Sequence, residues 1–278
     1  MGKLKKAVKR IYRDYLMGSK LKIYTTHLKK ILDAGYKIIP CKDLFNVSDN
    51  EKVCILRHDI DTDVKIAKKM FDIEKSLGIS STYYFRLSTL NKKVIDYIKQ
   101  NDKNTEVSYH FEEISTFAKE QGINSKDEID KNLDVIRENF KRNLSFVREK
   151  YDIECSTIAS HGDFVNRKIG IINNYFLNED LRKELNISLE AYDNELMINA
   201  VYISDGKFDL LQKNNKTVIE ESIEQQKNKL YMLVHPRTWS SAPIERLKVD
   251  LKRYKEGKSY DKKIKKNDKC HKTGKETR

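Results

Sequence analysis

The stretch Val53-Cys-Ile-Leu-Arg-His-Asp-Ile-Asp61 decides the fold class of this chain. It begins as a run of apolar residues of the kind that forms a buried strand, and it ends in charged residues. After Asp61, apolar residues recur at helical spacing as far as Gly78, whose position predicts the end of a helix. A buried strand followed directly by a helix indicates one βα unit of a parallel sheet.

The same alternation recurs along the chain. The clearest helical pattern begins at Ser125, which forms a capping-box sequence with Glu128, and it continues through Val147. Strands alternating with helices of this length predict an α/β fold with a parallel sheet or barrel. The predicted strands are residues 37–40, 53–57, 82–86, 106–109, 156–160, 201–203 and 230–234.

Length and composition narrow the class of protein. A chain of 278 residues that is 38% hydrophobic can bury a sizeable core, and it is neither collagen-like nor a disulfide-rich miniprotein. No apolar run approaches the roughly 18 residues of a membrane span, and no apolar signal region follows the basic start. The four cysteines are scattered, as is typical of reduced thiols. We therefore expect a cytoplasmic protein without a transmembrane segment.

The net charge of +13 is concentrated toward the two ends of the chain, and residues 246–278 carry 14 Lys and Arg against 5 Asp and Glu. Such a basic segment suits contact with an anionic surface. Motifs typical of nucleic-acid binding are missing, so nucleic acid is not an expected partner. The predicted organisation is a basic helical N-terminal segment (1–30), a catalytic domain (31–245) and a basic, partly disordered C-terminal tail (246–278).

Four of the six histidines lie in polar clusters that follow predicted strands. Because the carboxyl ends of parallel strands meet at one edge of a sheet, these clusters are expected to form one site. The histidines concerned are His58, His110, His161 and His235. The other two, His27 and His271, lie in a predicted helix and in the basic segment, and we expect both at the surface.

Two carboxylates share one side of the first cluster. Side chains alternate along an extended strand, so Asp59 and Asp61 should point to one side and His58 to the other. A carboxylate with neutral imidazoles is the usual ligand set for zinc or another first-row divalent ion. A cation on one carboxylate leaves the other free as a base. This pattern favours a metal-dependent hydrolase.

Several motifs, taken in order, resemble a known family. Leu56-Arg-His-Asp-Ile-Asp61 and the later Gly78-Ile-Ser-Ser-Thr-Tyr-Tyr-Phe85 resemble the start of the polysaccharide deacetylase (NodB-homology, carbohydrate esterase family 4-like) superfamily, in its divergent RHDxD branch. The resemblance covers roughly residues 30–240, and its later motifs are residues 106–112, 159–162, 202–206 and 233–236. It implies a distorted (β/α) barrel, usually seven-stranded, and metal-dependent removal of an N-acetyl group from an amino sugar or glycan precursor.

The resemblance also implies roles for individual residues. Asp59 matches the catalytic base of the family, and His235 matches the general acid. Asp61 and His110 match metal ligands, and zinc is the expected ion. One residue is inserted in this first motif, however, so the roles of Asp59 and Asp61 are interchangeable at this level.

Other positions depart from the family pattern. Ile114 stands where a second metal-binding histidine is usual, and we favour His161 as the third ligand, with Glu113 as the alternative. The usual Arg-x-Pro motif is absent, which leaves Arg57 or Arg237 to supply a cation near the base.

Three further side chains are candidates for contact with the substrate or with the catalytic residues. Asp163 and Asp205 are expected to orient a histidine or bind a sugar hydroxyl, and Trp239 either stacks on a sugar ring or packs in the core. The predicted function is therefore a cytoplasmic, zinc-dependent carbohydrate deacetylase acting on an N-acetylated sugar or glycan precursor. The alternative is a catalytically inactive relative that binds a glycan or serves as a scaffold.

Overall fold

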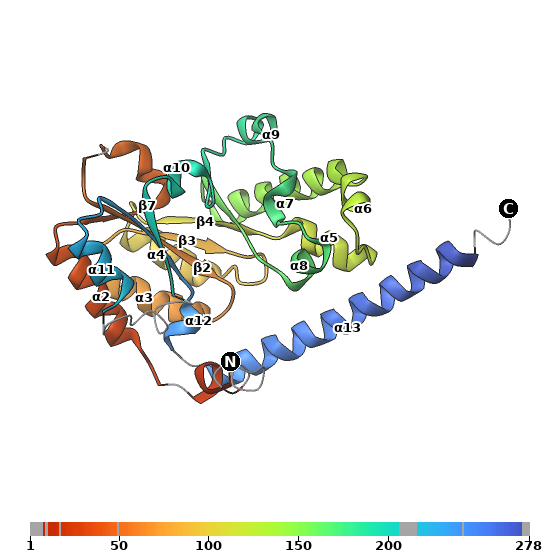
Figure 1. The fold of residues 1–278 in the computed structure, drawn as a ribbon, viewed down its shortest axis with the longest axis horizontal. Coiled ribbons are helices and arrows are strands. Elements are labelled where there is room, and N and C mark those ends of the chain that lie inside the picture. The colour runs from red at the N-terminus through yellow and green to blue at the C-terminus, as the bar shows by residue number, and fades with distance from the viewer. Residues whose placement is uncertain are drawn as a thin grey trace.

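The computed structural model describes residues 8, 11–16, 18–48, 50–205, 216–240 and 242–273. Its parallel strands form one sheet in the order β6-β5-β4-β3-β2-β8-β7, and β1 pairs with one end of β2 (Figure 1). The strands are β1 (Lys37–Ile39), β2 (Val53–Ile60), β3 (Thr82–Phe85), β4 (Glu106–Phe111), β5 (Thr157–Ser160), β6 (Leu189–Glu190), β7 (Ala200–Ser204) and β8 (Lys229–Val234).

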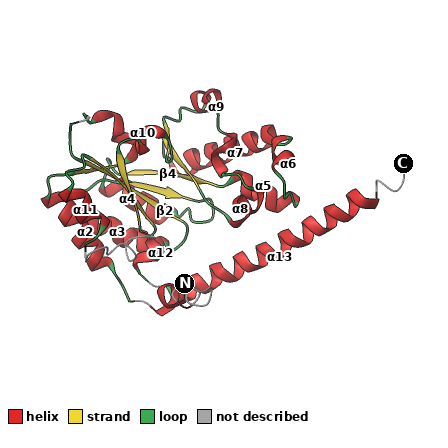
Figure 2. Ribbon diagram, in the orientation of Figure 1, coloured by secondary structure: helices red, strands yellow, loops and turns green. Residues whose placement is uncertain are grey.

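Helices surround the strands, as Figure 2 shows in red and yellow. Among the described residues, no helix is long and apolar enough to cross a bilayer. The α-helices are α2 (Leu21–Asp33), α3 (Val64–Ser76), α4 (Lys92–Asn101), α5 (Glu113–Gln121), α6 (Lys126–Asp130), α7 (Leu133–Tyr151), α8 (Phe164–Ile169), α9 (Glu179–Glu184), α10 (Asn194–Met197), α11 (Val218–Glu224), α12 (Pro236–Trp239) and α13 (Pro243–Thr273). Three other short helical segments are η1 (Tyr12–Leu16), η2 (Cys41–Asn46) and η3 (Asn173–Phe176).

The sheet curls around an interior cluster of buried side chains. Leu189 of β6, Tyr84 of β3 and Tyr231 of β8 belong to this cluster, although they come from separate parts of the sheet. The Tyr231 hydroxyl donates a hydrogen bond to the carbonyl of Ala191, just beyond β6, at 2.7 Å. In the part of the chain that the structure describes, β6 and β7 do not pair, so the barrel is open on one side. The predicted α/β class is confirmed, and so is the distorted seven-stranded barrel, which is formed by the seven strands from β6 to β7 without β1.

The predicted strands agree closely with the structure, but one predicted helix does not. The helix expected from Ser125 to Val147 is two helices, α6 and α7. Ser125 does cap α6, since its side chain accepts a hydrogen bond from the amide of Glu128. At the break, the Asn132 side chain donates to the carbonyl of Glu128 at 2.7 Å. Such local side-chain bonds compete with the helical ladder, and the apolar periodicity did not reveal them.

The expected surface position of His27 is wrong. His27 is 7% exposed on α2, and its ring lies edge-on to Trp239 with 6.3 Å between centroids. The apolar face of α2 packs beside the sheet, and His27 belongs to that face. The side chain of His271 and residue Gly206, part of the motif at 202–206, lie outside the described residues.

Most of the segment predicted as a basic, partly disordered tail is the helix α13. It packs on the body through Tyr260 and Ile264, which are 0% and 7% exposed and join the core cluster around α5 and α7. The Tyr260 hydroxyl donates to the carbonyl of Ile123. The start of the helix is fixed by Arg246, which donates to the carbonyls of Arg237 and Ser240. The division of the chain at residues 30 and 245 stays a prediction.

Gly122 permits the close approach of α13. It ends α5 in the left-handed region (φ +71°), and a Cβ atom there would lie 2.7 Å from Lys263 Cβ and 3.0 Å from its carbonyl carbon. Gly170 ends α8 with a similar φ of +83°, but a Cβ atom at that position would have no packing neighbour within 4 Å. The two glycines therefore share the backbone requirement and differ in the steric one.

We expect Gly122→Ala to destabilise the protein more than Gly170→Ala. Both variants place alanine in the left-handed region, at about 1–2 kcal/mol, and overpacking against α13 adds about 1–3 kcal/mol at position 122 alone. Urea unfolding gives the two free energies, and trypsin cleavage within the lysine-rich α13 reports its release. Equal stability and equal cleavage of the two variants would contradict the close packing of α13 on α5.

Candidate active site

Three potential metal-binding atoms converge at the carboxyl edge of the sheet. His110 lies at the end of β4, His161 directly follows β5 and Asp61 directly follows β2. Asp61 Oδ1 is 2.9 Å from His161 Nδ1 and 3.4 Å from His110 Nε2, and these two ring nitrogens are 3.2 Å apart. The pairing of β4 with β5, in which His110 lies opposite Ala159, sets this arrangement. The predicted gathering of strand ends therefore occurs.

The residues fit a divalent metal ion. Zinc binds nitrogen and oxygen ligands at about 2.0–2.2 Å, so the donor atoms of a tetrahedral site lie roughly 3.4 Å apart. The three observed separations are at or slightly below that value. His110 Nδ1 is 3.0 Å from the carbonyl of Ala159, a contact that makes Nδ1 the donor and leaves the Nε2 lone pair directed at Asp61. His161 and His110 are 4% and 2% exposed, and Asp61 has 15% of its side chain exposed.

Electrostatics favour the ligand form of Asp61 and of His161, whereas they favour the protonated form of His110. Burial raises the pKa of Asp61, but the neighbouring His161 and His110 outweigh burial and hold that pKa well below its usual range. Burial lowers the pKa of His161, and the opposing effect of Asp61 does not restore it. Burial also lowers the pKa of His110, where Asp59 and Asp61 reverse the direction and raise it. At neutral pH, Asp61 is ionised and His161 is neutral, as metal binding requires.

A second group of potential ligands, Glu112, His161 and Asp163, lies beside the first. Its carboxylates already have cationic partners. Arg86 donates to both oxygens of Glu112, at 3.1 and 2.6 Å, and Lys119 lies 3.1 Å from Asp163. The group around Asp61 therefore fits a metal ion better.

Asp59 lies beside these three residues and outside the donor group. It is 3% exposed, and its Oδ2 is 3.7 Å from His110 Nε2. Its Oδ1 has no hydrogen-bond partner among the described residues and lies 3.7 Å from Arg57 Nε. Arg57 is fully buried, with its guanidinium carbon 4.5 Å from the ring centroid of Tyr192 and 5.3 Å from that of Tyr231. Of the two candidate cations, Arg57 is the one that contacts Asp59.

His58 lies on the face of β2 that is turned away from the site. His58 Nε2 is 2.9 Å from Glu74 Oε1 of α3, and both side chains are fully buried. Tyr24 and Tyr83 also donate to this carboxylate, at 2.6 and 2.9 Å. The predicted alternation along β2 therefore holds, and His58 has a structural partner of its own.

His235 is joined to Asp205 next to the donor group. His235 directly follows β8, and its Nδ1 is 2.9 Å from Asp205 Oδ1, which directly follows β7. Its backbone amide donates to Asp205 Oδ2 at 2.6 Å. Burial lowers the pKa of His235, but Asp205, with smaller contributions from Asp61 and Asp59, raises it to about 9. The imidazole is therefore protonated at neutral pH.

The remaining candidates are divided between the site and the core. Trp239 is 3% exposed, packs on Tyr24 and donates to Asp205 Oδ2 at 3.2 Å, so its ring is not placed to stack on a sugar. Asp163 caps α8 by accepting from the amide of Val165 and lines a cavity with His161. Arg237 lines the same cavity. Glu113 points elsewhere and accepts from Tyr109 at 2.6 Å and from Asn143 at 3.1 Å.

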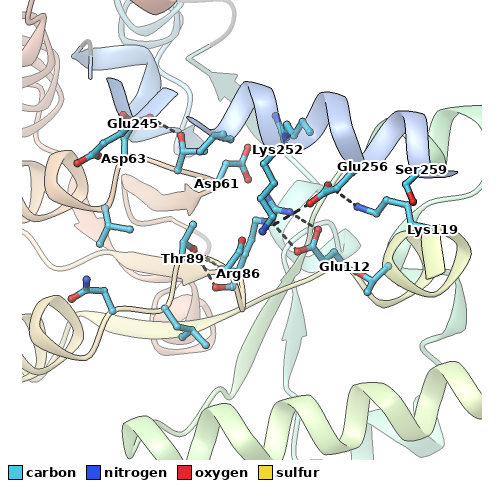
Figure 3. A pocket seen from close by; sticks show the side chains of 18 of the residues that line it. Asp61, Asp63, Arg86, Thr89, Glu112, Lys119, Glu245, Lys252, Glu256 and Ser259 are labelled. Atoms are coloured by element: carbon cyan, nitrogen blue, oxygen red, sulfur yellow. Dashed lines mark hydrogen bonds and ion pairs between the residues drawn. The ribbon is translucent and has the colours of Figure 1, made fainter. Parts of the chain in front are cut away.

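Two cavities adjoin the site, and both include Asp61. One, of about 500 Å³, is lined by His161, Asp205, His235 and Arg253. The other, of about 680 Å³, lies between α13 and the strand ends and contains the Arg86–Glu112 pair (Figure 3). Three residues of these cavities, Arg86, Glu112 and Arg253, have no predicted role from the sequence. Arg86 and Glu112 directly follow strands, as the histidines do, and this position was the signal in the sequence that could have identified them. Arg253 gave no such signal, because it lies in the predicted tail.

Comparison with known proteins gave matches only at the level of structure. No protein-family model and no curated protein matches the chain. Three similar solved structures are a CE4 family pseudoenzyme from Bacillus anthracis in wild-type form, a mutant, and a mutant with restored enzymatic activity. Each is 12% identical and covers 74% of this chain, with TM-scores of 0.41–0.42. The matched part spans 63–65% of the length of those chains.

These matches describe a likeness of chain arrangement and say nothing about activity in the present protein. The polysaccharide deacetylase-like fold expected from the sequence motifs agrees with the parallel, seven-stranded and partly open barrel described above.

Proposed function

We propose that this protein is a metal-dependent hydrolase that removes an N-acetyl group from an amino sugar or glycan precursor. The observation that carries the proposal is the convergence of Asp61, His110 and His161 within 3.4 Å of one another, beside the unpaired oxygen of Asp59. His235 lines a cavity together with Asp61 and His161. A ligand set, a base and an acid at one sheet edge are what amide hydrolysis requires.

Asp61, His110 and His161 would hold the metal ion, and zinc suits this donor set of two nitrogens and one oxygen. When bound, the ion supplies Lewis acidity to the acyl carbonyl and makes water more acidic. Asp61 is the carboxylate in the donor group, whereas Asp59 is outside it. This difference supports Asp61 as the ligand and Asp59 as the base.

Asp59 and His235 divide the proton transfers between them. Asp59 Oδ1 accepts the proton of the attacking water, since no hydrogen bond of the described structure occupies that oxygen. The guanidinium of Arg57, with its Nε 3.7 Å from this oxygen, is the cation next to the base. His235, protonated because of Asp205, gives its proton to the departing nitrogen. Trp239 holds Asp205 from the other side and so positions the acid.

The alternative function, a catalytically inactive glycan-binding or scaffold protein, is favoured by one observation. Ile114, which replaces the second histidine of the family motif, is fully buried in the core cluster around α7. It cannot bind a metal ion, so a site of the usual composition is missing. His161 supplies a nitrogen donor in compensation, and acetate release from N-acetylated sugars by the zinc-loaded protein decides between the two functions. Full zinc loading without acetate release from any sugar would favour the inactive alternative.

Zinc content should depend on His161 and be independent of Glu113. We expect His161→Ala and His110→Ala to reduce zinc from about one ion per chain to nearly none, because two donors hold the ion far less tightly than three. Glu113→Gln removes a carboxylate of similar burial outside the donor group and serves as the matched control. Elemental analysis measures the metal, and circular dichroism verifies folding. Retention of zinc by folded His161→Ala protein, with loss in Glu113→Gln, would identify Glu113 as the ligand.

The two aspartates should separate in their effects. Asp59→Asn is expected to lower acetate release by at least about 100-fold while zinc content is unchanged, because the amide cannot act as a base. Asp61→Asn should lower both. Parallel assays of acetate and zinc on the two variants measure this difference. If Asp59→Asn lost the metal and Asp61→Asn retained it, the two roles would be exchanged.

The pH dependence should report the acid. Because the pKa of His235 is raised to about 9, its protonated form persists through neutral pH and is lost as the pH rises through that value. We therefore expect kcat/KM for acetate release to fall above about pH 9. Asp205→Asn removes the carboxylate that raises this pKa and should move the fall to lower pH. An unchanged alkaline limb in folded Asp205→Asn protein would exclude His235 as the group responsible.

A further inference from the structure

One face of α13 is turned toward the candidate active site. Arg246 and Tyr260, which are 1% and 0% exposed, anchor the helix to the body at two points. Arg253 lies midway, seven residues from each anchor. Seven residues are almost two full turns of an α-helix, so Arg253 shares the inward face with both anchors. It is partly buried and lines both cavities that include Asp61.

Arg253 differs from the other basic residues of the larger cavity in having no partner among the residues that the structure describes. Lys65 pairs with Glu245 at 3.3 Å, and Lys119 pairs with Asp163. Arg86 pairs with Glu112, as Figure 3 shows beneath α13. By contrast, Arg253 has neither a hydrogen bond nor an ion pair to any described residue.

The smaller cavity contains a second guanidinium of the same kind. Arg167, on α8, is exposed, lines this cavity with Arg253 and has no hydrogen bond or ion pair within the described ranges. Two of the carboxylates that line the cavity already have partners of their own, Lys119 for Asp163 and His235 for Asp205. Arg253 and Arg167 therefore present guanidinium groups to the cavity that no described carboxylate engages.

We infer that Arg253 and Arg167 bind an anionic group of the substrate. The proposed deacetylase would then act on an N-acetylated amino sugar that carries a phosphate or a carboxylate. A guanidinium presents a planar fork of donors that matches both anions, and two forks from different helices suit a group with several oxygens. This inference rests on the proposed function, which supplies the N-acetylated amino sugar as the substrate. The anionic group is inferred from the arginines on α8 and α13.

The two anchors of α13 fix the position of Arg253 relative to the cavities. Fixed at Arg246 and Tyr260, the helix holds Arg253 over the cavities in the free protein, so little ordering is required when an anion binds. The basic segment, expected from the sequence to contact an anionic surface, would instead contact an anionic substrate through this residue.

Binding of small sugars tests the inference separately from hydrolysis. Isothermal titration of the zinc-loaded full chain with N-acetylglucosamine, N-acetylglucosamine 1-phosphate and N-acetylmuramate compares a neutral, a phosphate-bearing and a carboxylate-bearing N-acetylated amino sugar. We expect at least one anionic sugar to bind at least 10-fold more tightly than the neutral one. The stronger of the two identifies the anion. Equal affinity for all three, or no binding of either anionic sugar, would overturn the inference.

Variants distinguish the two arginines from general positive charge. Arg253→Gln and Arg167→Gln should each weaken anionic-sugar binding by about 10-fold and leave neutral-sugar binding unchanged, and Arg253→Lys should restore part of the loss. Lys255→Gln is the matched control, because it removes the same charge from an exposed position about 200° away around the helix. If Arg253→Gln weakened binding no more than Lys255→Gln, the anion site would not include Arg253.

The two proposals fail in different ways. Anion binding that depends on Arg253, without acetate release from any sugar, would support the anion site and contradict the proposed deacetylase activity. Acetate release from neutral and anionic sugars with equal kcat/KM, unaffected by Arg253→Gln, would support the proposed deacetylase activity and contradict the anion site. Trypsin resistance is the control for the packing of α13. Each variant must resist cleavage within this helix as well as the wild-type protein does.

Discussion

The alternation of side chains along β2 is the constraint on which the rest of the site depends. Arg57 and Asp59 face the interior of the curled sheet, and His58 faces α3, where Glu74 holds it at 2.9 Å. A shift of this strand by one residue would exchange the two faces, burying Asp59, the proposed base, against α3 and leaving His58 in the site. The buried His58–Glu74 pair opposes such a shift, since breaking it would leave an uncompensated polar group in the core.

Buried charges at this edge of the sheet occur in compensated sets. Asp61 lies between two imidazoles, and Asp205 lies against His235. Pairing makes their burial tolerable, and it also fixes which groups carry a proton at neutral pH. Asp59, the proposed base, has Arg57 at 3.7 Å and no hydrogen bond to its Oδ1 from the described residues. Stability and the division of chemical roles therefore come from the same contacts.

Much of the fold and the gathering of strand ends could be predicted from the sequence, because apolar periodicity reports burial and parallel strands end at a common edge. The two-residue strand β6 is too short to give such a pattern, and the Asn132 contact that divides α6 from α7 depends on one side chain. Trp239 and His27 illustrate a further limit. Whether an aromatic side chain lines a cavity or packs beneath it depends on α2, which lies more than 200 residues from Trp239 in the chain.

The helix α13 marks where sequence reasoning was least informative. Its composition, rich in lysine and poor in apolar residues, is that of a solvated segment, and Tyr260 and Ile264, in its second half, are the residues of α13 that join the described core cluster. Those contacts work because Gly122 lets the helix approach α5 without a side chain between them. A long-range steric fit of this kind has no local signature. Its consequence is that Arg253 of this basic helix lines the cavities beside Asp61, so the proposed specificity for an anionic sugar depends on the packing of a helix outside the barrel.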